Sequence, residues 1–334
     1  MARRSTVKAL VIGASGHLGN AIVRAFVNRN YRITACGRRS VPPANLSDLS
    51  VRYLSGDSET PGLLDKWIDG HDLVVDAAAP YPLHAFSPVS EFGNDPIAQA
   101  ERRTRLLLDA VRRHKARLVY VGSFVTMVRP RTDAQRFKHE LMRLAHPYFE
   151  VKELIESQML DASRRGLPVV IGNPTYCLGP WDLHDRDLCM IPLLLRGEIP
   201  SSISQMLNVI DVRDVADAIG AAIDTERYGQ PIQISGHDIS TDELYSLICE
   251  LGGVPRPRIS TATTFALAGA YSMELMLGMI GENTRLPSGG MMMATLFDYL
   301  VSGDQMSQLG VAPRPLSETI VDAIKWYRKI GYCT

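Results

Sequence analysis

The amino-acid sequence predicts an α/β protein built on a doubly wound parallel sheet, with a smaller and mostly helical lobe in the C-terminal half. Two observations predict this fold class. Short apolar segments rich in β-branched residues alternate with longer segments in which apolar residues recur every three or four positions, and a glycine-rich turn follows the first apolar segment. Strands that are apolar throughout, with helices between them, are typical of a parallel sheet covered on both faces.

The strands and helices are predicted mainly in the first half of the chain. Apolar segments predict strands at Val7–Ile12, Tyr31–Cys36, Val51–Leu54, Leu73–Asp76, Leu118–Val121 and Val169–Ile171. Helical periodicity predicts helices at His17–Asn28, Gln99–Arg113 and Val151–Arg164. Beyond about residue 173 proline, glycine and methionine become frequent and strand patterns are hard to find. One later segment, Asn208 to Ala218, again predicts a short strand followed by a helix.

Composition excludes several classes of protein. Lys plus Arg and Asp plus Glu both number 36, so there is no basic excess to bind nucleic acid or an anionic membrane. Hydrophobic residues make up 46% of the chain, which is enough for a large core. The 5 cysteines are scattered and form no CxxC pair, which favours a reducing compartment. The N-terminal residues show no secretion signal, so we expect a soluble, cytoplasmic protein.

The turn after the first strand predicts a phosphate site. Gly13, Gly16 and Gly19 lie between that strand and the first helix. Glycines let the backbone turn tightly and approach a pyrophosphate, and the helix N-terminus offers free N–H groups to the anion. Because the turn follows a strand and opens a helix, the sequence predicts a Rossmann dinucleotide site. The spacing GxxGxxG is one residue wider than the usual fingerprint.

The end of the second strand predicts which dinucleotide binds. In this place many NAD sites carry an acidic residue for the ribose 2′-hydroxyl. The segment Ala35–Arg39 has no acid but two guanidiniums, Arg38 and Arg39, which suit a 2′-phosphate. The sequence therefore favours NADP(H) over NAD(H), while a solvated basic loop is the alternative.

The domain organisation follows from these patterns. Residues 1–172 are expected to form the dinucleotide-binding Rossmann domain, to which residues 208–235 return. Residues 173–207 and 236–334 are expected to form the substrate-binding lobe. The most apolar later stretch, Thr261 to Gly281, is interrupted by Glu274 and lacks basic flanks, which predicts a buried helix rather than a membrane span.

Three residues form a candidate catalytic set. Tyr148 and Lys152 lie four apart at the start of a helical segment that opens with Pro147, so both side chains share one helix face. A phenol with a pKa of about 10 needs a nearby cation or helix end to act as an acid or base at neutral pH. Ser123 ends the strand before this helix, at the sheet edge where parallel sheets place their sites. A Tyr-x-x-x-Lys pattern alone also occurs by chance, so order and context carry the prediction.

Several segments are similar to those of one family. Beside the glycine turn and the Ser123, Tyr148 and Lys152 set, they are Gly56–Ser58, Asp76–Ala79, Gly172–Pro180, Asn208–Asp217 and Gln308–Ile320. Over nearly its whole length the chain resembles the extended short-chain dehydrogenase/reductase superfamily, with its NAD-dependent epimerases and dehydratases. It is nearest the dihydroflavonol-reductase, cinnamoyl-CoA-reductase and 3β-hydroxysteroid-dehydrogenase branch. Two departures are Gly122, where a second serine is common, and Val151, where a serine often precedes the lysine.

The resemblance implies a mechanism and a cofactor site. It implies hydride transfer between nicotinamide and carbonyl carbon, with Tyr148 as proton donor, Lys152 lowering the pKa of that tyrosine and holding the nicotinamide ribose, and Ser123 orienting the carbonyl oxygen. No motif marks the family's fourth catalytic residue, an asparagine. The resemblance and the glycine-turn argument together predict the cofactor contacts. These are Gly13, Ser15, Gly16, His17, Leu18, Gly19, Arg38, Arg39, Asp57, Ser58, Ala77, Ala78, Tyr148, Lys152, Pro174 and Thr175.

The predicted substrate is a small hydrophobic carbonyl compound or alcohol, polycyclic or aromatic. Met, Leu and aromatic residues gather in 265–280 and 290–297, and the branch that the chain resembles acts on steroids, flavonoids and phenylpropanoid thioesters. The same two stretches are equally typical of core helices. Two other functions stay open: a sugar-nucleotide epimerase or dehydratase that recycles its cofactor, and a non-catalytic NADP-binding sensor. The oligomeric state also stays open, with a homodimer as one alternative.

A metal site is not expected. The segment from Trp181 to Asp187 gathers one histidine and three carboxylates. Arg186 lies among these ligand candidates, however, and their spacing matches no known metal motif.

Overall fold

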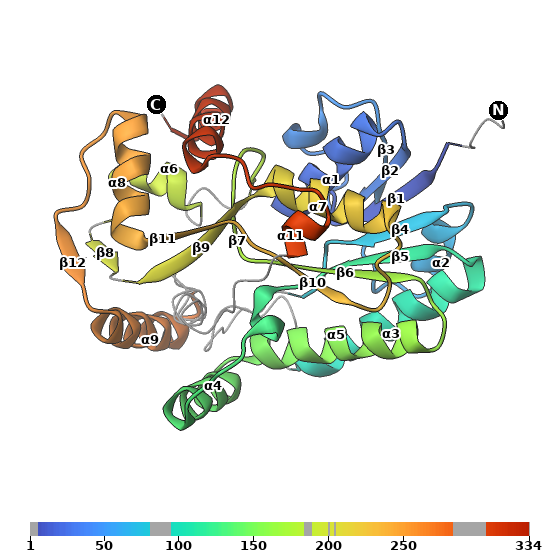
Figure 1. Ribbon diagram of the computed structural model, residues 1–334, viewed down its shortest axis with the longest axis horizontal. Helices are drawn as coiled ribbons and strands as arrows, with labels where there is room; N and C mark the ends of the chain where they lie inside the picture. Colours follow the sequence, from blue (N-terminus) through green and yellow to red (C-terminus); the bar gives the residue numbers. More distant parts are fainter. Residues whose placement is uncertain are drawn as a thin grey trace.

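A seven-stranded parallel sheet forms the centre of the larger part of the molecule (Figure 1). The computed structural model describes residues 6–80, 95–183, 189–199, 201–203, 205–282 and 305–333. The strand order is β10-β6-β5-β4-β1-β2-β3. The strands are β1 (Lys8–Ile12), β2 (Arg32–Gly37), β3 (Arg52–Ser55), β4 (Leu73–Asp76), β5 (Arg117–Val121), β6 (Val169–Pro174) and β10 (Pro231–Ile234). The order reverses between β1 and β4, which is the point where such sheets bind dinucleotides.

Helices cover both faces of this sheet. One face packs against α1 (His17–Asn28) and α7 (Val212–Asp224), and the other against α2 (Leu63–Ile68), α3 (Pro96–His114) and α5 (Pro147–Arg164). The alternation of side chains along β1 shows why: Ala9 and Val11 belong to the first core, Leu10 and Ile12 to the second. A strand that is buried on both faces must be apolar at every position, as the sequence pattern requires.

The second lobe combines two small sheets with helices. One sheet has the order β11-β9-β7 and the other pairs β12 with β8. These strands are β7 (Tyr176–Leu178), β8 (Ser201–Ile203), β9 (Met206–Asp211), β11 (His237–Ser240) and β12 (Ile259–Thr261). The helices of this lobe are α6 (Met190–Leu195), α8 (Thr241–Gly252), α9 (Thr263–Met279) and α12 (Leu316–Lys329). Leu194, Leu244, Ile248, Ile320 and Ile324 meet in its core.

Four further helical segments lie in the described residues. The 3₁₀ helices η1 (Ala44–Leu46) and η2 (Phe124–Met127) follow β2 and β5 respectively, α4 (Asp133–Ala145) precedes α5, and α11 (Gln305–Gln308) packs on β10. In the described residues, none of the helices combines the length and apolar character needed to cross a bilayer.

The predicted fold class is confirmed, and all six strands predicted in the first half are present within two residues of their predicted starts. Of the segment 208–235, β10 joins the main sheet and α7 packs on α1, whereas β9 lies in the second sheet. The short strands β7, β8, β11 and β12 were not predicted, because they have three or four residues and include polar ones.

The prediction that Thr261 to Gly281 forms a buried helix is only half right. The helix is present as α9, but Phe265, Met276 and Met279 are 77%, 61% and 73% exposed. Its buried side is a single stripe, Leu267, Ala270, Tyr271 and Glu274, at helical spacing. Because apolar residues surround the helix on all sides, composition alone could not show which side packs. The stretch 290–297 lies outside the described residues.

Candidate active site

The glycine turn after β1 has the geometry of a phosphate cradle. Gly13 has φ +80°, and a Cβ there would lie 2.6 Å from the carbonyl oxygen of Ala77. A Cβ on Gly19 would overlap the carbonyl oxygen of Gly13. Gly16 is the N-cap of α1 and makes no side-chain hydrogen bond to the first turn, and such a helix N-terminus suits an anion. The turn therefore fits a dinucleotide pyrophosphate.

The end of β2 lies against this turn. Gly13 N–H and Ala14 N–H both donate to the carbonyl of Cys36, and a Cβ on Gly37 would lie 3.4 Å from Ser15 Oγ. Arg38 and Arg39 follow immediately and are exposed. The segment 35–39 contains no carboxylate, and the ribose contacts of Arg38 and Arg39 stay a prediction.

A buried ion pair joins helix α3 to the end of β4. Arg103 on α3 forms two hydrogen bonds to the Asp76 carboxylate, of 2.8 and 2.7 Å, and both side chains are buried. Arg103 Nε also donates to Ser58 Oγ at 3.2 Å. Burial opposes ionisation of Asp76, but the guanidinium beside it holds the pKa of that carboxyl below its ordinary value. The loop with Asp57 and Ser58, two of the predicted cofactor contacts, is thereby joined through Arg103 to the end of β4.

Ser123 and Tyr148 come together at the same edge. The Tyr148 hydroxyl donates to Ser123 Oγ over 2.9 Å, although the residues belong to different elements. Ser123 follows β5 as the N-cap of η2, and Tyr148 lies in the first turn of α5 after Pro147. Both side chains are buried, at 7% and 2% exposure. The arrangement pairs two hydroxyls in a place shielded from bulk water.

Lys152 lies one helical turn beyond Tyr148. Its Nζ is 5.7 Å from the centre of the tyrosine ring, and only 4% of the residue is exposed. Burial lowers the pKa of this ammonium to about 8, although the Asp76 carboxylate opposes the change. A cation with a pKa so close to neutrality can respond to the charge of groups that bind beside it.

The remaining predicted cofactor residues lie near the glycine turn or at strand ends, and their contacts within the protein differ. His17 and Leu18 open α1; His17 Nδ1 lies 3.9 Å from Asp182 Oδ2, and Leu18 packs on the core. Ala77 and Ala78 follow β4, and Ala78 N–H donates to Asp76. Pro174 ends β6, and Thr175 directs its N–H to the carbonyl of Ile234. All of these lie beside the glycine turn or at carboxyl ends of strands, and their contacts with a cofactor stay a prediction.

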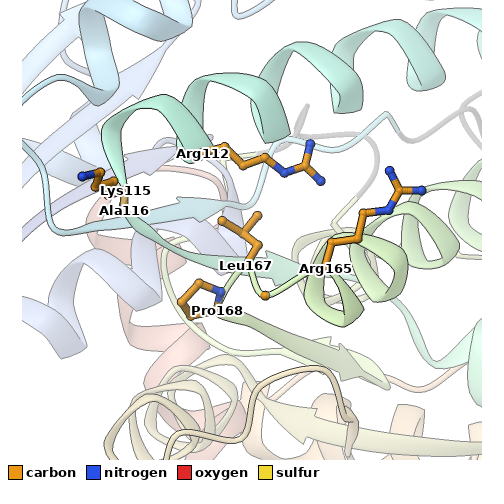
Figure 2. A pocket seen from close by; sticks show the side chains of 7 residues that line it. Arg112, Lys115, Ala116, Arg165, Leu167 and Pro168 are labelled. Carbon is orange, nitrogen blue, oxygen red and sulfur yellow. The ribbon is translucent and has the colours of Figure 1, made fainter.

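A cavity elsewhere in the molecule does not belong to this site. It has a volume of about 280 Å³ and lies among Arg112, Lys115, Ala116, Arg165, Gly166, Leu167 and Pro168 (Figure 2). These residues directly precede β5 and β6, at the amino edge of the sheet. Ser123 follows the other end of β5, and a five-residue strand is ~17 Å long. The cations here also lie at the C-terminal ends of α3 and α5, where they offset the helix dipoles.

Sequence reasoning missed three residues of the site. Arg103 has no motif around it, although a buried Asp76 at a strand end does call for a counter-charge. Asn173 and Glu156 were not singled out either; both are buried and hydrogen-bonded to each other beside Ser123. Among the residues that the structure describes, no group of three or more histidine, cysteine, aspartate or glutamate side chains could hold a metal ion. Residues 184–187 of the segment 181–187 lie outside that part of the chain.

The strand order, the glycine cradle and the helix N-terminus behind it define a dinucleotide-binding enzyme fold of the Rossmann class. The chain belongs to the NAD-dependent epimerase/dehydratase family, whose model matches residues 9–235. Together with reductase-named relatives, this membership makes it an NAD(P)-dependent enzyme of the reductase, epimerase and dehydratase group.

Individual relatives are distant but extend over the whole chain. The chain is 26% identical over 333 residues to a putative dihydroflavonol 4-reductase of Synechocystis, covering 96% of this chain and 95% of the relative. It is 25% identical over 329 residues to sterol demethylase protein B of Methylococcus capsulatus, covering 96% and 98%. Among solved structures, a nucleoside-diphosphate-sugar epimerase of Pseudomonas aeruginosa, PA4631, superposes with a TM-score of 0.74 at 25% identity, covering 98% and 99%.

Proposed function

We propose that this chain is an NADPH-dependent oxidoreductase that interconverts a hydrophobic ketone or aldehyde, polycyclic or aromatic, with its alcohol. The observation that carries the proposal is the hydrogen bond of 2.9 Å between the Tyr148 hydroxyl and Ser123 Oγ, with the buried ammonium of Lys152 one turn away. Three polar groups of these kinds, buried side by side at the cofactor edge, suit proton transfer to a carbonyl oxygen.

The three side chains divide the chemistry between them. When bound, the nicotinamide supplies or accepts the hydride. Ser123 Oγ accepts the Tyr148 hydrogen bond, so its own hydroxyl hydrogen is available to a substrate carbonyl oxygen and can orient it. When the carbonyl oxygen lies beside both hydroxyls, Tyr148 turns its hydrogen from Ser123 Oγ to that oxygen and gives the proton to the alkoxide that forms. The charge on Lys152 stabilises the phenolate left behind. In alcohol oxidation the same groups act in reverse.

Arg38 and Arg39 support the choice of NADPH. They are exposed directly after β2, next to the glycine turn, where a 2′-phosphate can accept charge-assisted hydrogen bonds from both. Gly13, Gly16 and Gly19 hold the pyrophosphate in the same proposal, and Lys152 the nicotinamide ribose.

The surroundings of Tyr148 support an apolar substrate. Its ring belongs to the hydrophobic cluster of the second lobe, together with Phe124, Val125, Phe149 and Leu178. Two relatives that match over nearly the whole chain are named as a dihydroflavonol reductase and a sterol demethylase component. Both names describe large ring systems, which an apolar surface suits.

Two alternative functions have weaker support. A sugar-nucleotide epimerase or dehydratase is favoured by the likeness to PA4631, which is described as a nucleoside-diphosphate-sugar epimerase. Against it, the pair Arg38 and Arg39 suits a cofactor that leaves after each turnover rather than a recycled NAD. A non-catalytic NADP sensor would not need the buried set of Ser123, Tyr148 and Lys152.

The test is a competitive substrate screen with the purified protein. A series of polycyclic and aromatic ketones and aldehydes, and a series of UDP- and dTDP-sugars, are incubated with NADPH, and the corresponding alcohols with NADP. We expect NADPH consumption with members of the first series. Micromolar binding of sugar nucleotides, with no turnover of the apolar carbonyls, would overturn the proposal in favour of an epimerase.

A further inference from the structure

Glu156 is a buried carboxylate close to the proposed catalytic groups. It lies on α5 one turn beyond Lys152 and is 8% exposed. Its Oε2 accepts hydrogen bonds from Thr126 Oγ1, at 2.7 Å, and from Asn173 Nδ2, at 2.6 Å. A buried charge is costly unless such bonds satisfy it. Burial raises the pKa of Glu156 even with these two donors in place.

Asn173 transmits this interaction to Ser123. Its Oδ1 accepts the Ser123 backbone N–H at 3.1 Å, while its Nδ2 donates to Glu156 and, at 3.1 Å, to Thr126 Oγ1. Because an N–H only donates and a carboxylate only accepts, these two partners fix the orientation of the amide. The Ser123 carbonyl in turn accepts the backbone N–H of Thr126 at 3.3 Å. Both backbone polar groups of Ser123 are thus tied to the Glu156 cluster.

The departure at position 122 fits the same arrangement. A Cβ on Gly122 would overlap Asn173 Oδ1. The serine that is common at this position in the family would therefore displace the amide that holds the next residue. Gly122 leaves the room that Asn173 needs.

We propose that Glu156 is a positioning residue for the reaction, acting through Asn173 and Thr126 on the backbone of Ser123. The inference rests on the proposed function. By fixing that backbone, Glu156 sets the Ser123 hydroxyl at hydrogen-bond distance from Tyr148, and so in place for a substrate carbonyl. It touches neither substrate nor cofactor in this role.

The first experiment compares Glu156→Gln with a control on the same helix. The variant keeps the shape of the side chain but turns an acceptor into a partial donor that faces two donors. We expect kcat to fall about tenfold, since displacements of 1 Å can cost up to ~10² in rate, with the Kd for NADPH unchanged within about twofold. Glu153→Gln, whose carboxylate pairs with Arg143 at 2.9 Å, should leave kcat unchanged.

A double-mutant cycle separates positioning from a merely structural role. If Glu156 acts through Ser123, Glu156→Gln should cost little, below about twofold, in a Ser123→Ala background. Protonation of Glu156 replaces an acceptor by a donor, so we expect the kcat of the parent to fall at acid pH. This fall should be absent in Glu156→Gln. Equal fold-losses in both backgrounds would overturn the proposal. Should Glu156→Gln not fold, Thr126→Val tests the same path, with a smaller loss in kcat and the same background dependence expected.

A readout independent of turnover keeps this proposal distinct from the proposed function. Hydrogen exchange of the peptide covering residues 122–127 should be faster in Glu156→Gln than in the parent and in Glu153→Gln, because the Ser123 N–H loses a well-oriented acceptor. Unchanged exchange overturns the positioning role even if the parent reduces carbonyls. A parent that turns over nothing in the screen overturns the proposed function, while exchange still decides whether Glu156 holds Ser123.

Discussion

The hydroxyl groups of Tyr148 and Ser123 lie 2.9 Å apart, buried where η2 and α5 meet. Ser123 follows β5 as the N-cap of η2, and Tyr148 lies in the first turn of the helix that packs on α3. Since the tyrosine hydroxyl donates to the serine, the serine hydrogen is available to a third oxygen. In the proposed function this third oxygen is that of the substrate carbonyl.

Replacing Tyr148 should separate chemistry from folding. Tyr148→Phe removes one hydroxyl and keeps the ring in its apolar cluster, so the free energy of unfolding should fall by only about 0.5–1.5 kcal/mol. Turnover should fall at least ~10²-fold, because a positioned proton donor is lost. Steady-state kinetics and urea unfolding measure the two effects. Tyr31→Phe, a tyrosine before β2 at the amino edge, is the control; near-parent turnover of Tyr148→Phe would place the proton donor elsewhere.

Replacing Arg38 tests cofactor choice. Arg38→Ala should weaken NADPH binding by about 1.5–3 kcal/mol, the range for hydrogen bonds to a charged group, and leave NADH binding nearly unchanged. Calorimetric titration with both cofactors gives the difference directly. Arg32→Ala, an exposed arginine at the opposite end of β2, should change neither value. Equal losses for the two cofactors, or a parent that binds NADH more tightly, would refute the 2′-phosphate site.

Lys152 should be needed for turnover but should lower the free energy of unfolding. Its pKa is lowered to about 8, so the folded protein binds fewer protons than the unfolded chain between about pH 8 and the ordinary lysine value. The free energy of unfolding should accordingly rise with pH across that window in the parent, and less so in Lys152→Met. At pH 7 the variant should be more stable, on the order of 1 kcal/mol or more, yet inactive. Urea unfolding at pH 7 and 9.5 checks this; a variant less stable than the parent at pH 7 contradicts it.

The Asp76–Arg103 pair should be the opposite case, a charge pair that the fold needs. Arg103→Met leaves the buried Asp76 carboxylate without its guanidinium, which should cost about 3–5 kcal/mol. The double variant Arg103→Met/Asp76→Asn should recover much of this loss, since no charge is then left unpaired. Arg105→Met removes an exposed pair with Glu101 on the same helix and should cost below about 1 kcal/mol. Similar losses for the Arg103→Met and Arg105→Met single variants would contradict the argument.

The sequence predicts the parts of the fold and site that depend on local patterns. The glycine turn, the strand periodicity and the Tyr148–Lys152 spacing each lie within one short segment, so backbone geometry alone limits what they form. Asn173, Glu156 and Arg103 could not be found in this way. Asn173 and Glu156 bond to each other across 17 residues, Glu156 bonds to Thr126 across 30, and Arg103 bonds to Asp76 across 27, so only the packed fold brings these groups together. The prediction that α9 is buried was half wrong for a related reason, because a helix that is apolar on all sides does not show which face packs.

The central claim is that Tyr148 protonates a carbonyl while a hydride passes between cofactor and substrate. It is tested most directly with NADPH that carries deuterium at both C4 positions of the nicotinamide and a carbonyl substrate from the screen, with product mass measured for the parent and Tyr148→Phe. We expect one deuterium per product molecule, one NADPH consumed for each, and both lost together in Tyr148→Phe. Product formed without deuterium and without net NADPH consumption would contradict the claim and identify a redox-neutral enzyme instead.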